Sequence, residues 1–225
     1  MSDFTLVIGN KNYSSWSLRG WLAVRHAGID FEEIKIDLYT PESKAALLVH
    51  SPTGMVPLLK HGEIRVWDSL AILEYCARLS SEKFWWPADD AAYAYARSIA
   101  SEMHSGFFAL RNHAPMNLRA QFRGLDLSAD VEADVRRIEA LWTEAREKFG
   151  TDGDFLFGSF SAADMLYAPV VHRFNSYGVA VNEVCHAYMQ AVLKHPFMQE
   201  WAAAAAQETA IIVAGEIPKD ATKLG

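Results

Sequence analysis

The sequence has 225 residues, enough for one large domain or two small ones with a real hydrophobic core. Hydrophobic residues make up 51% of the chain and charged residues 22%, which is typical of a globular protein and excludes a disordered or membrane-embedded one. The formal net charge is -7 and no run is rich in lysine or arginine, so neither nucleic acid nor a membrane surface is expected as a partner.

The cellular compartment is predicted from the N-terminal residues, the apolar runs and the cysteines. Met1 to Phe4 carry no basic stretch, and no apolar run approaches the roughly 20 residues that span a bilayer. Cys76 and Cys185 lie far apart in helix-like patterns, so one disulfide is conceivable, but buried free thiols fit better. We therefore expect a cytoplasmic protein.

Residues 1–80 are predicted to form a small mixed sheet with helices on its faces. Phe4, Leu6 and Ile8 alternate as in a half-buried strand, and His61-Gly62 separates two apolar runs as in a hairpin. Between these strands the spacing of apolar residues becomes helical, and Gly28 is expected to end the first helix. The order β-α-β, a helical connection and β-β-α gives parallel strands and an antiparallel hairpin. This is an α/β, thioredoxin-like arrangement.

Residues 91–225 are predicted to form an all-helical bundle, and residues 81–90 a linker. Helical patterns run from Tyr93 to Arg111 and from Val131 to Phe149, and no convincing strand follows Asp89. Ser161 and Asp164 form a capping box that starts another helix. We predict a front domain in residues 1–80 and a helical back domain in residues 91–225.

The first strand-to-helix turn reads Asn12-Tyr13-Ser14-Ser15-Trp16-Ser17. Two hydroxyls stand where a helix N-terminus presents free N–H groups and a positive dipole. A bound thiol at such a place would shift toward its thiolate. The same residues also fit a plain helix cap, and from the motif alone the plain cap is the better interpretation.

Two later segments have the same ambiguity. Val56-Pro57 follows Ser51-Pro52-Thr53-Gly54, and a cis peptide there would turn the backbone of Val56 outward to pair with a peptide ligand. In Trp67-Asp68-Ser69, a serine hydroxyl at a helix start suits a carboxylate and Asp68 suits an ammonium group. Taken in isolation, a loop proline explains the first segment better, and an ordinary N-cap is a strong explanation of the second.

Taken in order, these motifs resemble the cytosolic glutathione transferase family over nearly the whole chain. The serine-rich turn, the S-P-x-G-x-V-P segment and D-S-L-A-I-L-E-Y resemble the glutathione-binding domain of the family, and Phe157 to Asp164 resembles the capping segment of its helical domain. The resemblance implies that Ser14 contacts the glutathione sulfur, with Ser15 and then Tyr13 as rivals. It also implies that the backbone of Val56, ahead of cis Pro57, pairs with the cysteinyl part.

The resemblance further assigns Asp68 and Ser69 to the γ-glutamyl end and leaves Asp164 and Ser161 as structural caps. It implies a homodimer that joins the front domain of one chain to the back domain of the other. The segment Ser14 to Arg19 looks like the S-S-C-S-W-R signature of zeta-class enzymes, the maleylacetoacetate isomerases. Trp16 replaces its cysteine, and Arg173-Phe174-Asn175-Ser176 stands where that class reads N-A-E-R.

The second substrate is expected between the serine turn and the first long back-domain helix. His104, Phe108 and Arg111 fall at i, i+4 and i+7, and so share one predicted helix face. One interpretation makes Phe108 a core residue beside two residues that border solvent or a subunit interface. The other makes the three a substrate wall, with Arg111 pairing a carboxylate.

The motifs together predict a glutathione transferase that conjugates the thiolate to a small, largely apolar electrophile. No His, Cys, Asp or Glu cluster has metal-ligand spacing, so no metal is expected. Two alternatives stay open. One is a glutathione-dependent cis-trans isomerase of the maleylacetoacetate isomerase kind, and the other is a non-catalytic glutathione-binding member of the fold.

Overall fold

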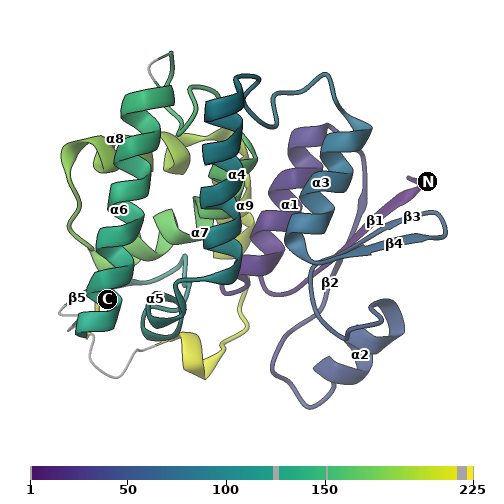
Figure 1. The fold of residues 1–225 in the computed structure, drawn as a ribbon. Coiled ribbons are helices and arrows are strands. Elements are labelled where there is room, and N and C mark those ends of the chain that lie inside the picture. The colour runs from purple at the N-terminus through teal and green to yellow at the C-terminus, as the bar shows by residue number, and fades with distance from the viewer. Residues whose placement is uncertain (1, 124–126, 151, 217–221, 225) are drawn as a thin grey trace.

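The computed structural model describes residues 2–123, 127–150, 152–216 and 222–224, and its first part is a four-stranded mixed sheet (Figure 1). The strands are β1 (Phe4–Ile8), β2 (Glu32–Lys35), β3 (Leu58–His61) and β4 (Ile64–Trp67). The order is β2-β1-β3-β4, with β1 parallel to β2 and antiparallel to β3, and with β3 and β4 joined as a hairpin. The predicted mixed sheet is confirmed.

Helices cover both faces of this sheet. They are α1 (Ser15–Ala27), α2 (Ser43–His50) and α3 (Ser69–Leu79). Because side chains of a strand alternate between faces, β1 sends Leu6 and Ile8 to the core shared with α1 and α3, and Val7 to a smaller core with Leu47 of α2. Gly28 ends α1 with φ 72°, the left-handed conformation that glycine adopts without steric cost.

The second part of the chain is mainly helical (Figure 1). Its helices are α4 (Asp90–Ser105), α5 (Phe108–His113), α6 (Ala129–Phe149), α7 (Ala162–Tyr177), α8 (Glu183–Lys194), α9 (Pro196–Ala206) and the short 3-10 helix η1 (Val213–Gly215). The prediction of no strand after Asp89 is wrong, because β5 (Gln121–Arg123) pairs antiparallel with β6 (Thr222–Leu224). Three-residue strands are too short to produce a clear period-two pattern.

The predicted single helix from Tyr93 to Arg111 is also wrong, because the chain breaks between α4 and α5. Phe107 has φ 58°, and Gly106 is extended with φ -120° and ψ -164°. A Cβ on Gly106 would lie 2.8 Å from the carbonyl oxygen of Glu102. Glycine fits this close approach, and the break redirects the chain after α4.

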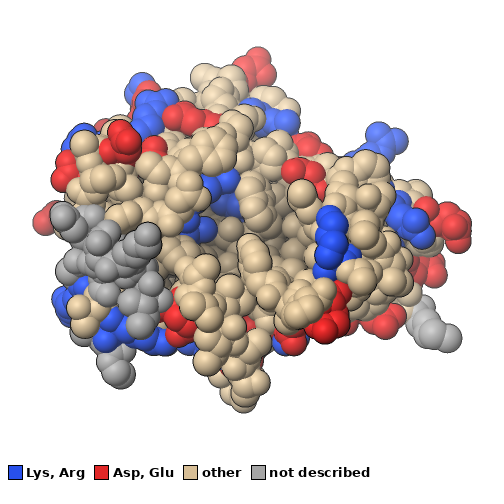
Figure 2. Space-filling view, turned by 90° about the horizontal axis from the view of Figure 1, so that it is seen from below, with Lys and Arg blue, Asp and Glu red and all other residues tan. Residues whose placement is uncertain are grey.

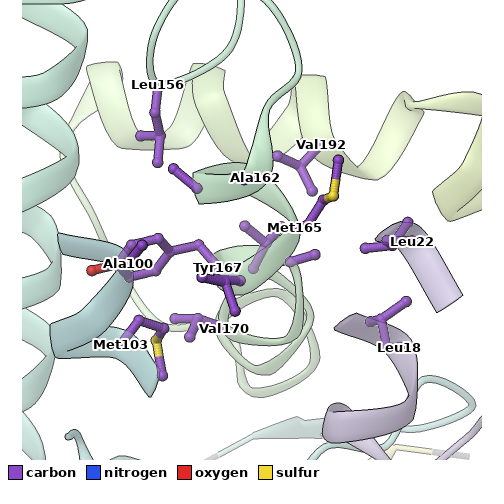
Figure 3. Packing of buried hydrophobic residues seen from close by; sticks show 14 of the residues in the cluster. Leu18, Leu22, Ala100, Met103, Leu156, Ala162, Met165, Tyr167, Val170 and Val192 are labelled. Carbon is purple, nitrogen blue, oxygen red and sulfur yellow. The ribbon is translucent and has the colours of Figure 1, made fainter. Parts of the chain in front are cut away.

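The two parts share one hydrophobic core around α7, in which every residue except Asn175 is buried. Figure 3 shows Leu18 and Leu22 of α1 facing Met165 of α7. Residues 81–89 of the predicted linker lie between α3 and α4, and Asp90 begins α4. Among the described residues, no helix is long and apolar enough to span a membrane.

Candidate functional site

A cleft of about 780 Å³ opens where the N-terminus of α1 meets α2 and α5. A smaller cavity of about 270 Å³ adjoins it, since Trp16, Met55 and Val56 line both. Figure 2 shows a hollow on this face of the molecule with lysine or arginine side chains inside it. The two cavities make one groove that runs from Ser14 to Ser69.

Ser14 and Ser15 both line the larger cavity, at the start of α1. Ser14 is the N-cap: its Oγ accepts the N–H of Ser17 at 3.3 Å and donates to Ser17 Oγ at 2.8 Å. The hydroxyl of Ser17 in turn accepts the N–H of Gly9 at 2.9 Å. Ser14 therefore caps the helix and also lines the cavity, so its role as a cap leaves it close to a ligand bound there.

Tyr13, the third candidate, has its hydroxyl engaged elsewhere. It donates to Glu216 and accepts from Arg119 Nη2 at 3.0 Å. Burial and the hydrogen bond to Glu216 raise the pKa of Tyr13, which makes its phenol a weaker proton donor. This arrangement favours the serines as the hydroxyls available to a ligand.

Val56 lines both cavities, and its peptide bond to Pro57 is cis. The expected cis bond is therefore present, immediately before β3. Pro57 lines the smaller cavity and also lies under α1, where a Cβ on Gly20 would come within 2.9 Å of its ring. Pro57 therefore contacts both the groove and α1, the helix that Ser14 caps.

Asp68 and Ser69 lie at the far end of the groove, at the start of α3. Asp68 has φ 74°, and its carboxylate accepts the N–H of Leu70 at 2.8 Å. Ser69 is buried, and its Oγ has no hydrogen-bond partner among the described residues. A buried hydroxyl without a partner is costly, so this atom is suited to a ligand oxygen beside the helix amides.

The three residues predicted to share a helix face do not share one helix. His104 lies in the last turn of α4, while Phe108 and Arg111 belong to α5 and line the larger cavity. Phe108 is 64% exposed, so its interpretation as a core residue is wrong. His104 lies 3.3 Å from a carboxylate oxygen of Asp68 and packs edge-on against Trp16. It therefore joins the two parts of the chain behind the groove.

Arg111 was predicted from the sequence, but Arg19 and Arg173, which lie close to it in an arginine cluster, were not. The guanidinium of Arg19 lies 4.6 Å from the centre of the Trp16 ring, and that of Arg111 lies 4.9 Å from it. Arg173 of α7 also lines the larger cavity and donates to the backbone carbonyls of Arg111 and Ala114. The available signal was an arginine shortly after the end of the mainly apolar stretch from Met165 to Val171.

Burial lowers the pKa values of all three arginines, and repulsion from neighbouring arginines adds to the effect for Arg19 and Arg173. The pKa of Arg19 is well below its usual value because of burial and then the charges of Arg111 and Arg173, although Asp68 offsets part of the effect. Burial, followed by the charge of Arg111, lowers the pKa of Arg173 to about 10. Among the described residues, no carboxylate forms an ion pair with any of the three. The cluster therefore places positive charge beside the cleft that nearby carboxylates offset only in part.

In the part of the chain that the structure describes, no three His, Cys, Asp or Glu side chains gather as metal ligands would. Cys76 and Cys185 are free and buried. Burial raises the pKa of the Cys76 thiol to about 12, so this thiol is not a nucleophile near neutral pH.

Comparisons with known proteins identify the family of this chain. Residues 13–79 match the model described as "Glutathione S-transferase, N-terminal domain", and residues 128–204 match "Glutathione S-transferase, C-terminal domain". "Glutathione S-transferase 1" of Dianthus caryophyllus is 33% identical over 75% of this chain and 76% of the relative. "Probable maleylacetoacetate isomerase" of Caenorhabditis elegans is 28% identical over 72% and 75%.

A solved structure has the same fold. It is that of a glutathione transferase homolog from Burkholderia GL BGR1 with bound glutathione, which superposes with a TM-score of 0.67 at 21% identity. The match covers 90% of this chain and 97% of that one. At this identity the likeness shows the fold alone, whereas the two domain models and the plant relative show the family. The chain therefore belongs to the glutathione S-transferase family.

Proposed function

We propose that this chain is a glutathione transferase in which glutathione lies along the groove from Ser14 to Ser69. The observation that carries the proposal is the groove itself, which begins at one helix N-terminus and ends at another. The N-terminus of α1 suits a thiolate, and that of α3, with the unpartnered hydroxyl of Ser69, suits a carboxylate. The backbone of Val56 lies between them and offers groups for peptide pairing.

Ser14 is proposed to stabilise the thiolate. Its hydroxyl has to rotate away from Ser17 Oγ to donate to sulfur, which costs one hydrogen bond. The oxygen of Ser14 can still accept the N–H of Ser17, so the helix stays capped. The helix dipole and the arginine cluster around Trp16 both favour a negative charge at this end of α1. Lowering a thiol pKa by two units takes about 2.7 kcal/mol, which these effects can supply together.

The bound thiolate supplies the nucleophile: it forms the new sulfur–carbon bond while the leaving group departs from the electrophile with the bonding electrons. The protein orients the acceptor and excludes water. Tyr39, Met55 and Phe108 line the larger cavity and are 85%, 67% and 64% exposed. This apolar rim suits a small electrophile with a hydrophobic part.

The proposal is tested by calorimetric titration with glutathione, followed by ultraviolet detection of bound thiolate, for the parent protein and two variants. Ser14→Ala is expected to bind glutathione within a few-fold of the parent and to lose the thiolate signal. The matched variant Ser15→Ala is expected to keep both. Absence of glutathione binding by the folded parent would overturn the proposal, and loss of thiolate only in Ser15→Ala would move the role to Ser15.

A second candidate function is favoured by the two cavity arginines. Arg111 and Arg173 suit an anionic substrate such as a small unsaturated diacid, which a glutathione-dependent isomerase would convert and release. The Caenorhabditis elegans relative is named as a probable isomerase of this kind. Turnover of such a diacid without loss of glutathione would single out this activity. Glutathione binding with no turnover across a broad electrophile panel would instead favour a non-catalytic member.

The assembly and the compartment are proposed from the family. A homodimer that joins the front domain of one chain (residues 1–80) to the back domain of the other (residues 91–225) is consistent with the exposed Trp67 and Tyr93 near this boundary. Sedimentation velocity at several concentrations measures the oligomeric state. We keep the cytoplasm as the proposed compartment, with glutathione and a small electrophile as the partners.

A further inference from the structure

One carboxylate from the far end of the chain binds two backbone N–H groups of the loop that precedes Ser14. Glu208 follows α9, and its Oε1 accepts the N–H of Lys11 at 2.8 Å while its Oε2 accepts the N–H of Asn12 at 3.1 Å. The side chain of Glu208 is only 6% exposed. A buried carboxylate that binds two successive backbone amides is a strong and directional clamp.

The surrounding contacts hold both the loop and the clamp. Trp201 Nε1 donates to the carbonyl of Lys11 at 3.0 Å, on the other side of the same residue. Arg119 donates from its side chain to the carbonyl of Glu208 and from its backbone N–H to Asn12 Oδ1 at 2.9 Å. The loop therefore touches the back part of the chain through side chains and backbone at once.

The clamp lies only two residues from the proposed catalytic hydroxyl. The N–H groups of Tyr13 and Ser14 both donate to the carbonyl of Asn10, at 3.2 and 2.8 Å, and so close one tight turn. Lys11 and Asn12 form the middle of that turn. Any displacement of their amides is passed to Ser14, since the turn closes over them.

We propose that Glu208 is a positioning residue for Ser14, which fixes the turn so that the serine hydroxyl points at the glutathione sulfur. The inference rests on the proposed function, because it gives Glu208 a role in activity only if Ser14 stabilises the thiolate. A misplacement of about 1 Å at a catalytic group can lower a rate about a hundredfold. Loosening the contacts of Glu208, which lie two residues from Ser14, can therefore have a large effect on the rate.

The sign of the pKa change separates positioning from a direct charge effect. Removing the negative charge of Glu208 lowers the pKa of a nearby thiol, because a like charge disfavours the thiolate. Loosening the Ser14 hydrogen bond raises the same pKa. The two effects have opposite signs, so an increase in the thiol pKa identifies the positioning role.

The experiment is an ultraviolet pH titration of bound glutathione in the parent, Glu208→Gln and Ser14→Ala. Glutamine keeps one acceptor oxygen and the shape of the side chain, so only one of the two amide bonds is lost. Glu208→Gln is expected to bind glutathione within about threefold of the parent and to raise the thiol pKa by about one unit, which is a tenfold lower thiolate fraction below that pKa. Glu208→Ala, which loses both bonds, is expected to shift the pKa further.

Two matched controls separate the clamp from its neighbours. Lys35→Gln removes the 3.5 Å ion pair between Lys35 and Glu208 but leaves both amide bonds, and Glu200→Gln removes a carboxylate from α9 that pairs with Arg25 instead. Both are expected to keep the thiol pKa of the parent. Thermal unfolding of every variant shows which ones are folded at the titration temperature.

Three outcomes of this titration decide whether Glu208 positions Ser14. A raised thiol pKa in Glu208→Gln, with parent values in both controls, supports the inference. An unchanged or lowered pKa in folded Glu208→Gln overturns it while leaving the role of Ser14 intact, provided that Ser14→Ala loses the thiolate. If Ser14→Ala keeps the thiolate of the parent, the proposed role of Ser14 fails, and the inference fails with it.

Discussion

Helices α1 and α7 both begin after a serine, yet their N-termini are completed in different ways. At α7, Asp164 supplies an internal anion: its carboxylate accepts the N–H of Ser161 at 2.8 Å and the N–H of Leu156 at 3.1 Å. At α1 the matching position, three residues after Ser14, holds the neutral Ser17. The N-terminus of α7 therefore has a carboxylate of its own, whereas the N-terminus of α1 has none at the matching position.

The surroundings of the two helix starts differ in the same direction. Ser161 and Asp164 are fully buried, whereas Ser14 lines the cleft and lies on the same helix as Arg19. A serine cap by itself therefore does not indicate a site. The residue three positions later and the presence of a cavity decide whether the helix dipole holds the fold together or is available to a ligand.

The largest effect that this comparison predicts is loss of stability in Asp164→Ala. The substitution leaves two buried N–H groups and the hydroxyl of Ser161 without their acceptor. We expect the free energy of unfolding to fall by about 4 kcal/mol, measured by urea denaturation. Glutathione binding by the folded fraction is expected to stay at the parent value, and a loss of binding in folded protein would contradict the separation of the two helix starts.

The ionisation of Asp164 gives the next effect. Burial raises its pKa from 3.8 to about 6, although the hydrogen bonds from Ser161 and Leu156 oppose the shift. The folded state thus holds the proton more tightly than the unfolded state, so the stability contributed by this proton is complete below pH 4 and is lost as the pH rises through 6. The change is on the order of 3 kcal/mol.

Unfolding free energies of the parent and Asp164→Asn, measured from pH 4 to pH 8, test this linkage. Asparagine cannot ionise, so the parent is expected to lose stability relative to the variant as the pH rises across the window. A difference that stays constant with pH would show that the carboxyl group does not titrate there.

The next prediction makes α1 resemble α7. Ser17→Asp places a carboxylate three residues after Ser14, where α7 has Asp164, and beside the N–H of Gly9 that Ser17 already binds. A fixed negative charge at this position is expected to raise the pKa of bound glutathione by about two units and to lower kcat/KM about a hundredfold at pH 7. The neutral Ser17→Asn has nearly the same shape, so equal losses in both variants would assign the effect to packing and not to charge.

Local patterns in the sequence predicted most of the fold. The alternation in β1, Gly28 after α1 and the capping box of Ser161 each depend on neighbours within a few residues, and each is present in the structure. The break at Gly106 was missed because apolar spacing continues across it into Phe108, and the positive φ of Phe107 leaves no pattern.

The site could be predicted only where it is local. The hydroxyls, the cis proline and the start of α3 are short segments whose order carries the signal. Arg173 lines the cleft and Glu208 binds the loop before Ser14, from 159 and 194 residues further along the sequence than Ser14. No spacing rule connects such residues, since their approach depends on how α7 and α9 pack against α1.

The smallest predicted effect concerns the charge that the open helix start faces. Arg111→Met keeps the length and the apolar part of the side chain over Trp16 but removes a guanidinium that lines the cleft. For an electrophile that carries a carboxylate, kcat/KM is expected to fall about tenfold, which corresponds to about 1.4 kcal/mol. For a neutral electrophile the fall is expected to be about threefold, since only the stabilisation of the thiolate is weakened. Arg111→Lys restores a charge without the fork geometry, so it is expected to recover the neutral substrate more fully than the anionic one. Equal losses for both electrophiles in Arg111→Met would show that Arg111 acts on the thiolate alone. Arg173, the other arginine that lines the cavity, would then be tested as the residue that binds the carboxylate of the electrophile.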